Sequence, residues 1–190
     1  MPALARNILP KVEEHEATGD TVRIYDEIKR ELQLPFVPNL FKTLAISPGA
    51  LAMYWSMLRS LYQHSTLPQS LIAMILYTVA QANDCQYCSA GYEVTCRTLG
   101  IDEETLGALT QDLGQVAPER IQAIIRFALK VTHNPKGLLA EDYDRLRNQG
   151  VTDAEAVEIV LIAAAGGHGN LLADALKVDV DAQTAQALGH

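Results

Sequence analysis

The sequence lacks several features by which large classes of protein are recognised. No cluster of lysine and arginine stands out and the net charge is −8, which excludes nucleic acid as a partner. No apolar run approaches the roughly 20 residues of a membrane span, so the longest runs, 71–82 and 156–165, predict buried helices. Residues 1–6 lack the apolar core of a secretion signal. We therefore expect a cytoplasmic protein with no membrane partner.

The sequence also lacks the alternation of apolar and polar residues that marks β-strands. Helical spacing and capping residues recur instead, which predicts an all-α fold. With 48% hydrophobic and 20% charged residues in 190 positions, one globular domain is expected. We assign 20–178 to a helical domain and 1–19 to an N-terminal arm, with a polar tail at 179–190. The acidic run at 13–16 predicts a solvated arm, and the tail carries no chemical signal.

The punctuation of the chain by proline, glycine and capping residues divides it into nine helices. Capping boxes are expected at 66–69 and 152–155. Two helices, over 68–82 and 153–165, are apolar on most faces, and a chain of this size has little room to hide both. We therefore expect a homo-oligomer whose subunits pack through apolar helices. The predicted helices span residues 20–32, 39–46, 48–63, 68–82, 84–99, 102–111, 118–133, 140–148 and 153–177.

Cysteine is scarce, with three in the chain, yet Cys85 and Cys88 lie only one helical turn apart. Helix geometry puts α-carbons at this spacing about 5 Å apart, within the roughly 4.4–6.8 Å that a disulfide tolerates. In the cytoplasm such a pair serves catalysis, redox sensing or metal binding rather than permanent cross-linking. Asn83 or Asp84 is the expected N-cap of this helix, which puts both thiols in its first turn. There the helix dipole lowers a thiol pKa, whereas the neighbouring Asp84 carboxylate raises it, and the sequence leaves the net direction open.

Three stretches resemble the carboxymuconolactone decarboxylase superfamily, on its alkyl hydroperoxidase D (AhpD-like) side, and most closely its peroxidase-related branch. They are 36–48 with Tyr54-Trp55, 80–88, and 150–162 with 170–176. The resemblance implies an AhpD-like helical bundle, usually assembled as a trimer or hexamer. The expected homo-oligomer is thus a dimer, trimer or hexamer. It also implies a thiol peroxidase with no cofactor or metal, in which Cys88 attacks the peroxide and Cys85 resolves the sulfenic acid.

The family pattern also contains a proton relay, and this chain departs from it. A glutamate twelve residues before the first cysteine and a histidine four after the second are replaced by Ala73 and Tyr92. Tyr92 shares the helical face of Cys88, and its phenol can donate a hydrogen bond but is a weak base. His168, among glycines at 166–169, is our candidate for a replacement base that faces the cysteines from a neighbouring helix.

The leading interpretation is a thiol-dependent hydroperoxide reductase that is recharged by a dithiol protein or a small thiol. A redox sensor or impaired scaffold without the Glu/His relay is the main alternative. A decarboxylase-like enzyme acting on a cyclic lactone acid is a third. For the cysteines themselves the alternatives are two buried structural thiols, or a zinc site made with Cys96 and His168, although the second Cys-x-x-Cys of most such sites is missing.

Overall fold

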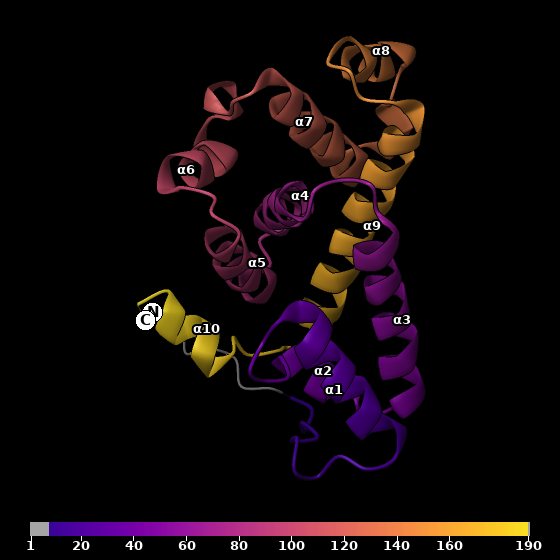
Figure 1. Ribbon diagram of the computed structural model, residues 1–190, viewed down its shortest axis with the longest axis vertical. Coiled ribbons are helices and arrows are strands. Elements are labelled where there is room, and N and C mark those ends of the chain that lie inside the picture. The colour runs from indigo at the N-terminus through magenta and orange to yellow at the C-terminus, as the bar shows by residue number, and fades with distance from the viewer. Residues whose placement is uncertain (1–7, 190) are drawn as a thin grey trace.

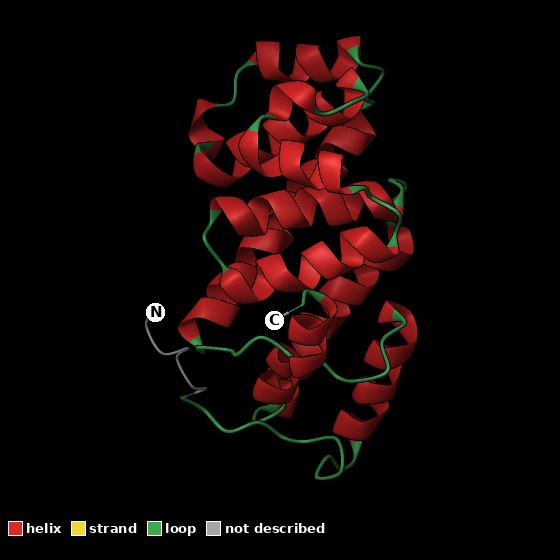
Figure 2. Cartoon of the chain, turned by 90° about the vertical axis from the view of Figure 1, so that its left-hand side faces the viewer, coloured by secondary structure: helices red, strands yellow, loops and turns green. Residues whose placement is uncertain are grey.

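The computed structural model describes residues 8–189, and within that range the chain forms helices and no strand (Figures 1 and 2). This confirms the all-α prediction. Short loops join the helices, and two single 3₁₀ turns, Leu113–Gln115 and Pro135–Gly137, flank α7. The α-helices are α1 Asp20–Leu32, α2 Asn39–Leu44, α3 Pro48–His64, α4 Gln69–Ala82, α5 Gln86–Thr98, α6 Glu103–Gln111, α7 Glu119–His133, α8 Ala140–Asn148, α9 Asp153–Ala175 and α10 Ala182–Ala187.

Helix α4 lies at the centre of the larger hydrophobic core. Residues 71–80 of this helix are all buried, and it packs against α5, α7 and α9. The apolar surface of α4 is therefore buried within a single chain, and this helix needs no second subunit to cover it. A second core fills the space between α1, α2 and α3, around Trp55 and Phe41, and reaches the C-terminal part of α9 at Leu172.

Helix α9 is apolar all round but only partly covered. One stripe of it is exposed, including Val157, Leu161 and Leu171 at 58–70% exposure, with Ala164 and His168 between them. Within the described residues this helix alone is long and apolar enough to cross a membrane, yet half of its apolar window is buried. A core helix of a globular protein has the same signature, and the helices around α9 indicate that case.

The arm and the tail depart from the sequence-based expectation. Glu13 and Glu14 form ion pairs of 2.8 Å with Lys42 and Lys29, so the acidic run is docked against the domain rather than solvated. The tail is also docked, because buried Asp181 accepts a 2.7 Å hydrogen bond from the Asn39 backbone N–H and α10 packs on α5. The expectation of no secretion signal at 1–6 lies outside the described residues.

The helix caps were predicted in part. Thr152 and Glu155 form the expected capping box at the start of α9, and Asp102 caps α6 through the Thr105 N–H. The box expected at 66–69 is wrong, because Pro68 is the N-cap of α4 and makes no side-chain cap. Thr66 instead hydrogen-bonds Glu158 on α9 through its backbone N–H and its hydroxyl, at 2.8 and 2.9 Å.

Candidate active site

The cysteine pair follows a tight turn between α4 and α5. The Cys85 N–H donates to the Ala80 carbonyl at 3.0 Å and the Asp84 N–H to the Gln81 carbonyl at 3.1 Å. These two bonds form a Schellman motif, in which the residue after the C-cap adopts a left-handed conformation and is usually glycine. Asp84 takes that conformation here, with φ 54°. The apolar contact typical of the motif joins Cys85 to Ala80, so the turn fixes the position of the first sulfur.

The Cys85 side chain is itself the N-cap of α5. Its sulfur accepts a hydrogen bond from the Cys88 backbone N–H at 3.4 Å. The expected N-caps are therefore wrong: Asn83 ends α4 and Asp84 occupies the turn. The prediction that both thiols lie at the start of the helix holds, with Cys85 at the cap and Cys88 three residues later. Both are free thiols and buried, but Cys88 keeps 6% of its surface exposed and Cys85 none.

The two thiols have opposite electrostatic environments. A hydrogen bond from the Cys85 thiol lowers the pKa of Cys88, and the Asn170 side chain lowers it further, against burial and the charge of Asp174. The same bond, together with burial, raises the pKa of Cys85 far above its usual range. Within residues 8–189 no cationic side chain lowers the pKa of Cys88, so its thiolate depends on hydrogen bonds. The neutral Cys85 sulfur also lies 4.0 Å from the Asn170 carbonyl oxygen.

Asn170 is a site residue that the sequence analysis did not single out. It is 2% exposed, and its carbonyl oxygen Oδ1 accepts a 2.8 Å hydrogen bond from the Asn83 amide in the turn before the cysteines. That bond fixes the orientation of the side chain. The Asn170 Nδ2 is buried without a hydrogen-bond partner among the described residues. A buried donor without a partner is costly, and here it is available to a thiolate or a substrate oxygen at Cys88.

Tyrosine side chains lie next to the cysteines. Tyr92 and Tyr87 pack directly against the buried cluster of Cys85, Cys88, Ala80 and Ala173. Tyr92 and Tyr62 also contact the core around α4, and Tyr54 approaches from α3. Burial raises the pKa of Tyr92 well above its usual range, and raises that of Tyr62 to about 12. These phenols are therefore protonated at neutral pH, and a role for Tyr92 in the chemistry of the cysteines stays a prediction.

The structure places His168 on the exposed stripe of α9, with its ring edge-on to Tyr54 at 5.6 Å between centroids. Asn170, two residues further along, lies about 200° around the helix, and it is Asn170 that reaches the cysteines. The glycines near His168 do allow close packing, because a Cβ on Gly169 would lie 2.8 Å from the Tyr54 hydroxyl. A role for His168 as base stays a prediction, with Tyr54 as its only described ring contact.

The zinc alternative finds no support in the described residues. Cys96 is buried in the core around α4, apart from the cluster that holds Cys85 and Cys88. No group of three or more histidine, cysteine, aspartate or glutamate side chains in residues 8–189 is arranged to hold a metal ion. At the relay position, Ala73 is a buried methyl group in α4.

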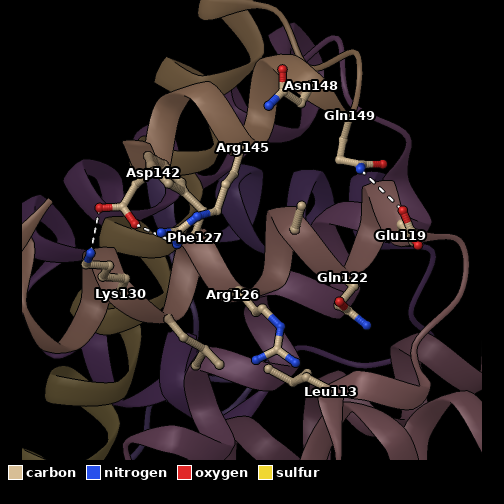
Figure 3. Close-up of a pocket in the computed structure, with 12 residues that line it drawn as sticks. Leu113, Glu119, Gln122, Arg126, Phe127, Lys130, Asp142, Arg145, Asn148 and Gln149 are labelled. Atoms are coloured by element: carbon tan, nitrogen blue, oxygen red, sulfur yellow. Dashed lines mark hydrogen bonds and ion pairs between the residues drawn. The ribbon is translucent and has the colours of Figure 1, made fainter. Parts of the chain in front are cut away.

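Two pockets of the chain lie away from the cysteines. A pocket of about 660 Å³ lies between α7 and α8 (Figure 3), and one of about 300 Å³ lies between α3 and α9. Neither is lined by Cys85 or Cys88. Of the two thiols, Cys88 alone has exposed surface.

Comparison with known sequences gives little, whereas comparison with solved structures gives a clear fold. No family model matches the chain. A segment of 48 residues is 42% identical to an (R)-2-haloacid dehalogenase of Pseudomonas putida, but it covers 25% of this chain and only 16% of that protein. The dehalogenase therefore bears on a fragment of this chain and not on its whole.

Solved structures match over nearly the whole chain. An uncharacterised peroxidase-related protein from Ralstonia eutropha JMP134, described as an alkylhydroperoxidase AhpD core, gives a TM-score of 0.85 at 25% identity, over 95% of this chain and 96% of that one. A peroxidase-related protein from Silicibacter sp. TM1040 gives 0.82 at 21% identity, over 97% of each chain. The debrominase Bmp8, in a C82A complex with 2,3,4-tribromopyrrole, also gives 0.82, at 18% identity over 97% of each chain. These matches show that the chain has the AhpD-like helical fold.

Proposed function

We propose that this chain is a thiol-dependent hydroperoxide reductase in which Cys88 attacks and Cys85 resolves. The observation that carries the proposal is the hydrogen-bonded pair at the start of α5. There Cys85 caps the Cys88 N–H at 3.4 Å and lowers the pKa of the more exposed sulfur. Only the thiolate is nucleophilic, so this asymmetry assigns a role to each cysteine.

The chemistry balances in three steps. The Cys88 thiolate attacks the outer oxygen of ROOH, the O–O bond breaks, and the alkoxide takes a proton to leave as ROH while Cys88 becomes a sulfenic acid. The Cys85 thiol then displaces hydroxide from that sulfur, and disulfide and water result. A dithiol donor, protein or small molecule, reduces the disulfide by exchange and is itself oxidised to a disulfide. The cytoplasm, where thiols are kept reduced, is the compartment that suits this cycle.

The residues around Cys88 can provide the proton and the hydrogen bonds that the missing Glu/His pair would provide. An alkoxide is more basic than a phenolate, so a neutral tyrosine such as Tyr92 can protonate it and recover the proton from water. The free Asn170 amide N–H can hydrogen-bond the thiolate before attack or the departing oxygen afterwards. Within residues 8–189, Asp174 is the one formal charge that acts on Cys88, and it is negative. It repels anions, so uncharged hydroperoxides suit the site better than anionic ones.

Hydroperoxide consumption with a dithiol reductant tests the proposal. We expect turnover of a neutral organic hydroperoxide by the native chain and by Cys96→Ser, whose sulfur is buried in another cluster. Turnover should vanish in Cys88→Ser. Disulfide formation without turnover would support the sensor interpretation instead. Activity that is indifferent to both cysteines would reject thiol chemistry and return attention to the lactone decarboxylase alternative.

Reductive dehalogenation is a second candidate, favoured by the debrominase of the same fold and by the cation-free thiol pair. On an electron-rich ring the halogen atom is electrophilic, so a thiolate can attack it and form an S–halogen bond while the C–halogen bond breaks. R–Br, H⁺ and the Cys88 thiolate would give R–H and a sulfenyl bromide, and Cys85 would then expel bromide and form the disulfide. Bromide release from a brominated pyrrole, with the same cysteine variants, tests this candidate. Loss of bromide release in Cys88→Ser is the expected result.

We further propose that the exposed stripe of α9 joins subunits. Val157, Leu161 and Leu171 recur at helical spacing, and each is more than half exposed. Apolar residues gathered on one face of a helix mark an interaction surface more often than isolated ones do. Sedimentation of the native chain should give an oligomer, and Leu161→Glu should shift it toward the monomer. A native chain that sediments as a monomer at micromolar concentration rejects this proposal.

A further inference from the structure

The pocket between α7 and α8 contains an arginine without a carboxylate partner. Seven of the eight arginines within residues 8–189 form an ion pair with aspartate or glutamate, as expected for a chain of net charge −8. Arg126 forms none with any described residue. In Figure 3 its side chain extends from α7 toward Leu113, and no interaction is drawn to it. An arginine left free in an acidic chain is available to an anion from outside.

The pocket around Arg126 has the size and the mixed lining of a small-molecule site. Its volume is about 660 Å³, and ligand sites commonly span about 300–1,000 Å³. Ala123, Phe127 and Leu129 of α7, with Leu113 of the preceding 3₁₀ turn, provide an apolar side. Phe127 is only 4% exposed, so this side of the pocket rests on the fixed core of the domain.

Two uncharged polar side chains of the pocket are free as well. Gln122 and Asn148 line it, and neither side chain has a hydrogen-bond partner within residues 8–189. The two carboxylates in the lining are Glu119 and Asp142. Glu119 accepts one long bond of 3.4 Å from Gln149.

The charges of the lining leave a positive excess. Asp142 is already held by Lys130, at 2.5 Å, by Arg145, at 3.3 Å, and by the Leu139 N–H. Arg126, Lys130 and Arg145 face the two carboxylates Glu119 and Asp142, so the lining has a net charge of +1. A single negative charge is therefore matched, whereas a dianion would also meet Glu119.

We propose that this pocket binds a small monocarboxylate with an apolar body, its carboxylate on the Arg126 guanidinium and its chain along Ala123 and Phe127. The planar fork of arginine matches a carboxylate with two parallel hydrogen bonds. Gln122 lies one turn before Arg126 on α7 and provides a further donor to the same group. The site is separate from the cysteines, and the proposal does not depend on thiol chemistry.

Titration calorimetry with octanoate tests the site, with octan-1-ol as the neutral probe of the same length. We expect octanoate to bind with a dissociation constant of about 0.1–1 mM, the range that a ligand of this size reaches at ordinary efficiency. Binding should weaken at least about tenfold in Arg126→Gln, because a charge-assisted pair is lost, and less in Arg126→Lys. Rising salt should weaken it as well.

Arg30→Gln is the matched control, since Arg30 is an exposed arginine of α1 that pairs with Glu31 and is not part of the pocket. It should bind octanoate as the native chain does, and both glutamine variants should keep the native melting temperature. Equal binding of octanol and octanoate overturns the proposal, as does native affinity in Arg126→Gln. Absence of octanoate binding up to about 10 mM, a concentration well above the expected constant, overturns it too.

Discussion

Removal of the Cys85 thiol should make Cys88 a weaker nucleophile without touching Cys88 itself. When Cys88 is ionised, the Cys85 thiol can donate to it rather than to the Asn170 backbone carbonyl, and that bond is the largest contribution to the lowered pKa of Cys88. A hydrogen bond to a charged group contributes about 1.5–3 kcal/mol. Its loss in Cys85→Ala therefore raises the pKa of Cys88, and at pH values below the native pKa it lowers the thiolate fraction by about tenfold to a hundredfold.

The rate of iodoacetamide alkylation at Cys88, followed by mass spectrometry across pH, measures this change. The pKa of Cys88 rises when the donor is lost, so the rate profile moves to higher pH. The alkylation rates of the variant and the native protein should converge at a pH where Cys88 is fully ionised in both. Cys96 is an internal reference, because it is fully buried and burial raises its pKa to about 12, so it should remain unlabelled in both proteins.

A second variant separates hydrogen bonding from structural damage. Cys85→Ala also removes the N-cap acceptor of α5, whereas Cys85→Ser retains an acceptor for the Cys88 N–H and a donor for the thiolate. Serine should therefore preserve most of the native alkylation rate, and alanine should not. A native pH profile in Cys85→Ala refutes the hydrogen-bond origin of the Cys88 pKa. Equal losses in both variants would show that the sulfur itself, or the packing around it, is responsible.

Three further substitutions probe the frame of the site. Asn170→Ala should slow Cys88 alkylation by about tenfold, the loss of one charge-assisted donor, with stability reported separately by urea unfolding. Asp84→Gly should raise the free energy of unfolding by about 0.5–1 kcal/mol, because Asp84 has a left-handed backbone that glycine adopts freely. Gly169→Ala should lower it by about 1–3 kcal/mol, since the new Cβ would lie 2.8 Å from the Tyr54 hydroxyl. Gly167→Ala, with open space at its Cβ, is the matched control and should change stability far less.

The helices were predictable because their signals are local. Caps, prolines and apolar spacing predict residues 20–32 and 140–148 at the bounds found for α1 and α8. The start of α5 was not predicted, because the residue that usually marks a Schellman turn is glycine and Asp84 occupies the position. Asp84 and Asn83 read as N-caps in sequence, since both residue types favour that place, and only the turn's two backbone bonds show the cap to be Cys85.

The partners of the cysteines were predictable only where they share the cysteine helix. Tyr92 lies four residues after Cys88, so helical spacing alone identifies it. Asn170 lies 85 residues beyond Cys85 and reaches it through the packing of α9 on α5. Because α9 is apolar on nearly all sides, its sequence does not reveal which face turns inward. The sequence analysis therefore chose His168 and passed over Asn170, and only the packing at Gly166 and Gly169 shows the phase of the helix.

In the proposed thiol cycle, the turn between α4 and α5 also favours one sulfur as the attacking atom. The Schellman bonds hold Cys85 against Ala80 at the end of α4, where it has no exposed surface and its pKa is raised. Cys88 begins the helical part of α5, where first-turn N–H groups favour an anion, and it keeps a path to solvent. For Cys85 to attack, a buried thiolate would have to form without that support and meet a substrate that cannot reach it. If the proposed cycle operates, backbone geometry sets the direction of attack, and we expect a substitution that moves the turn to alter it even with both cysteines intact.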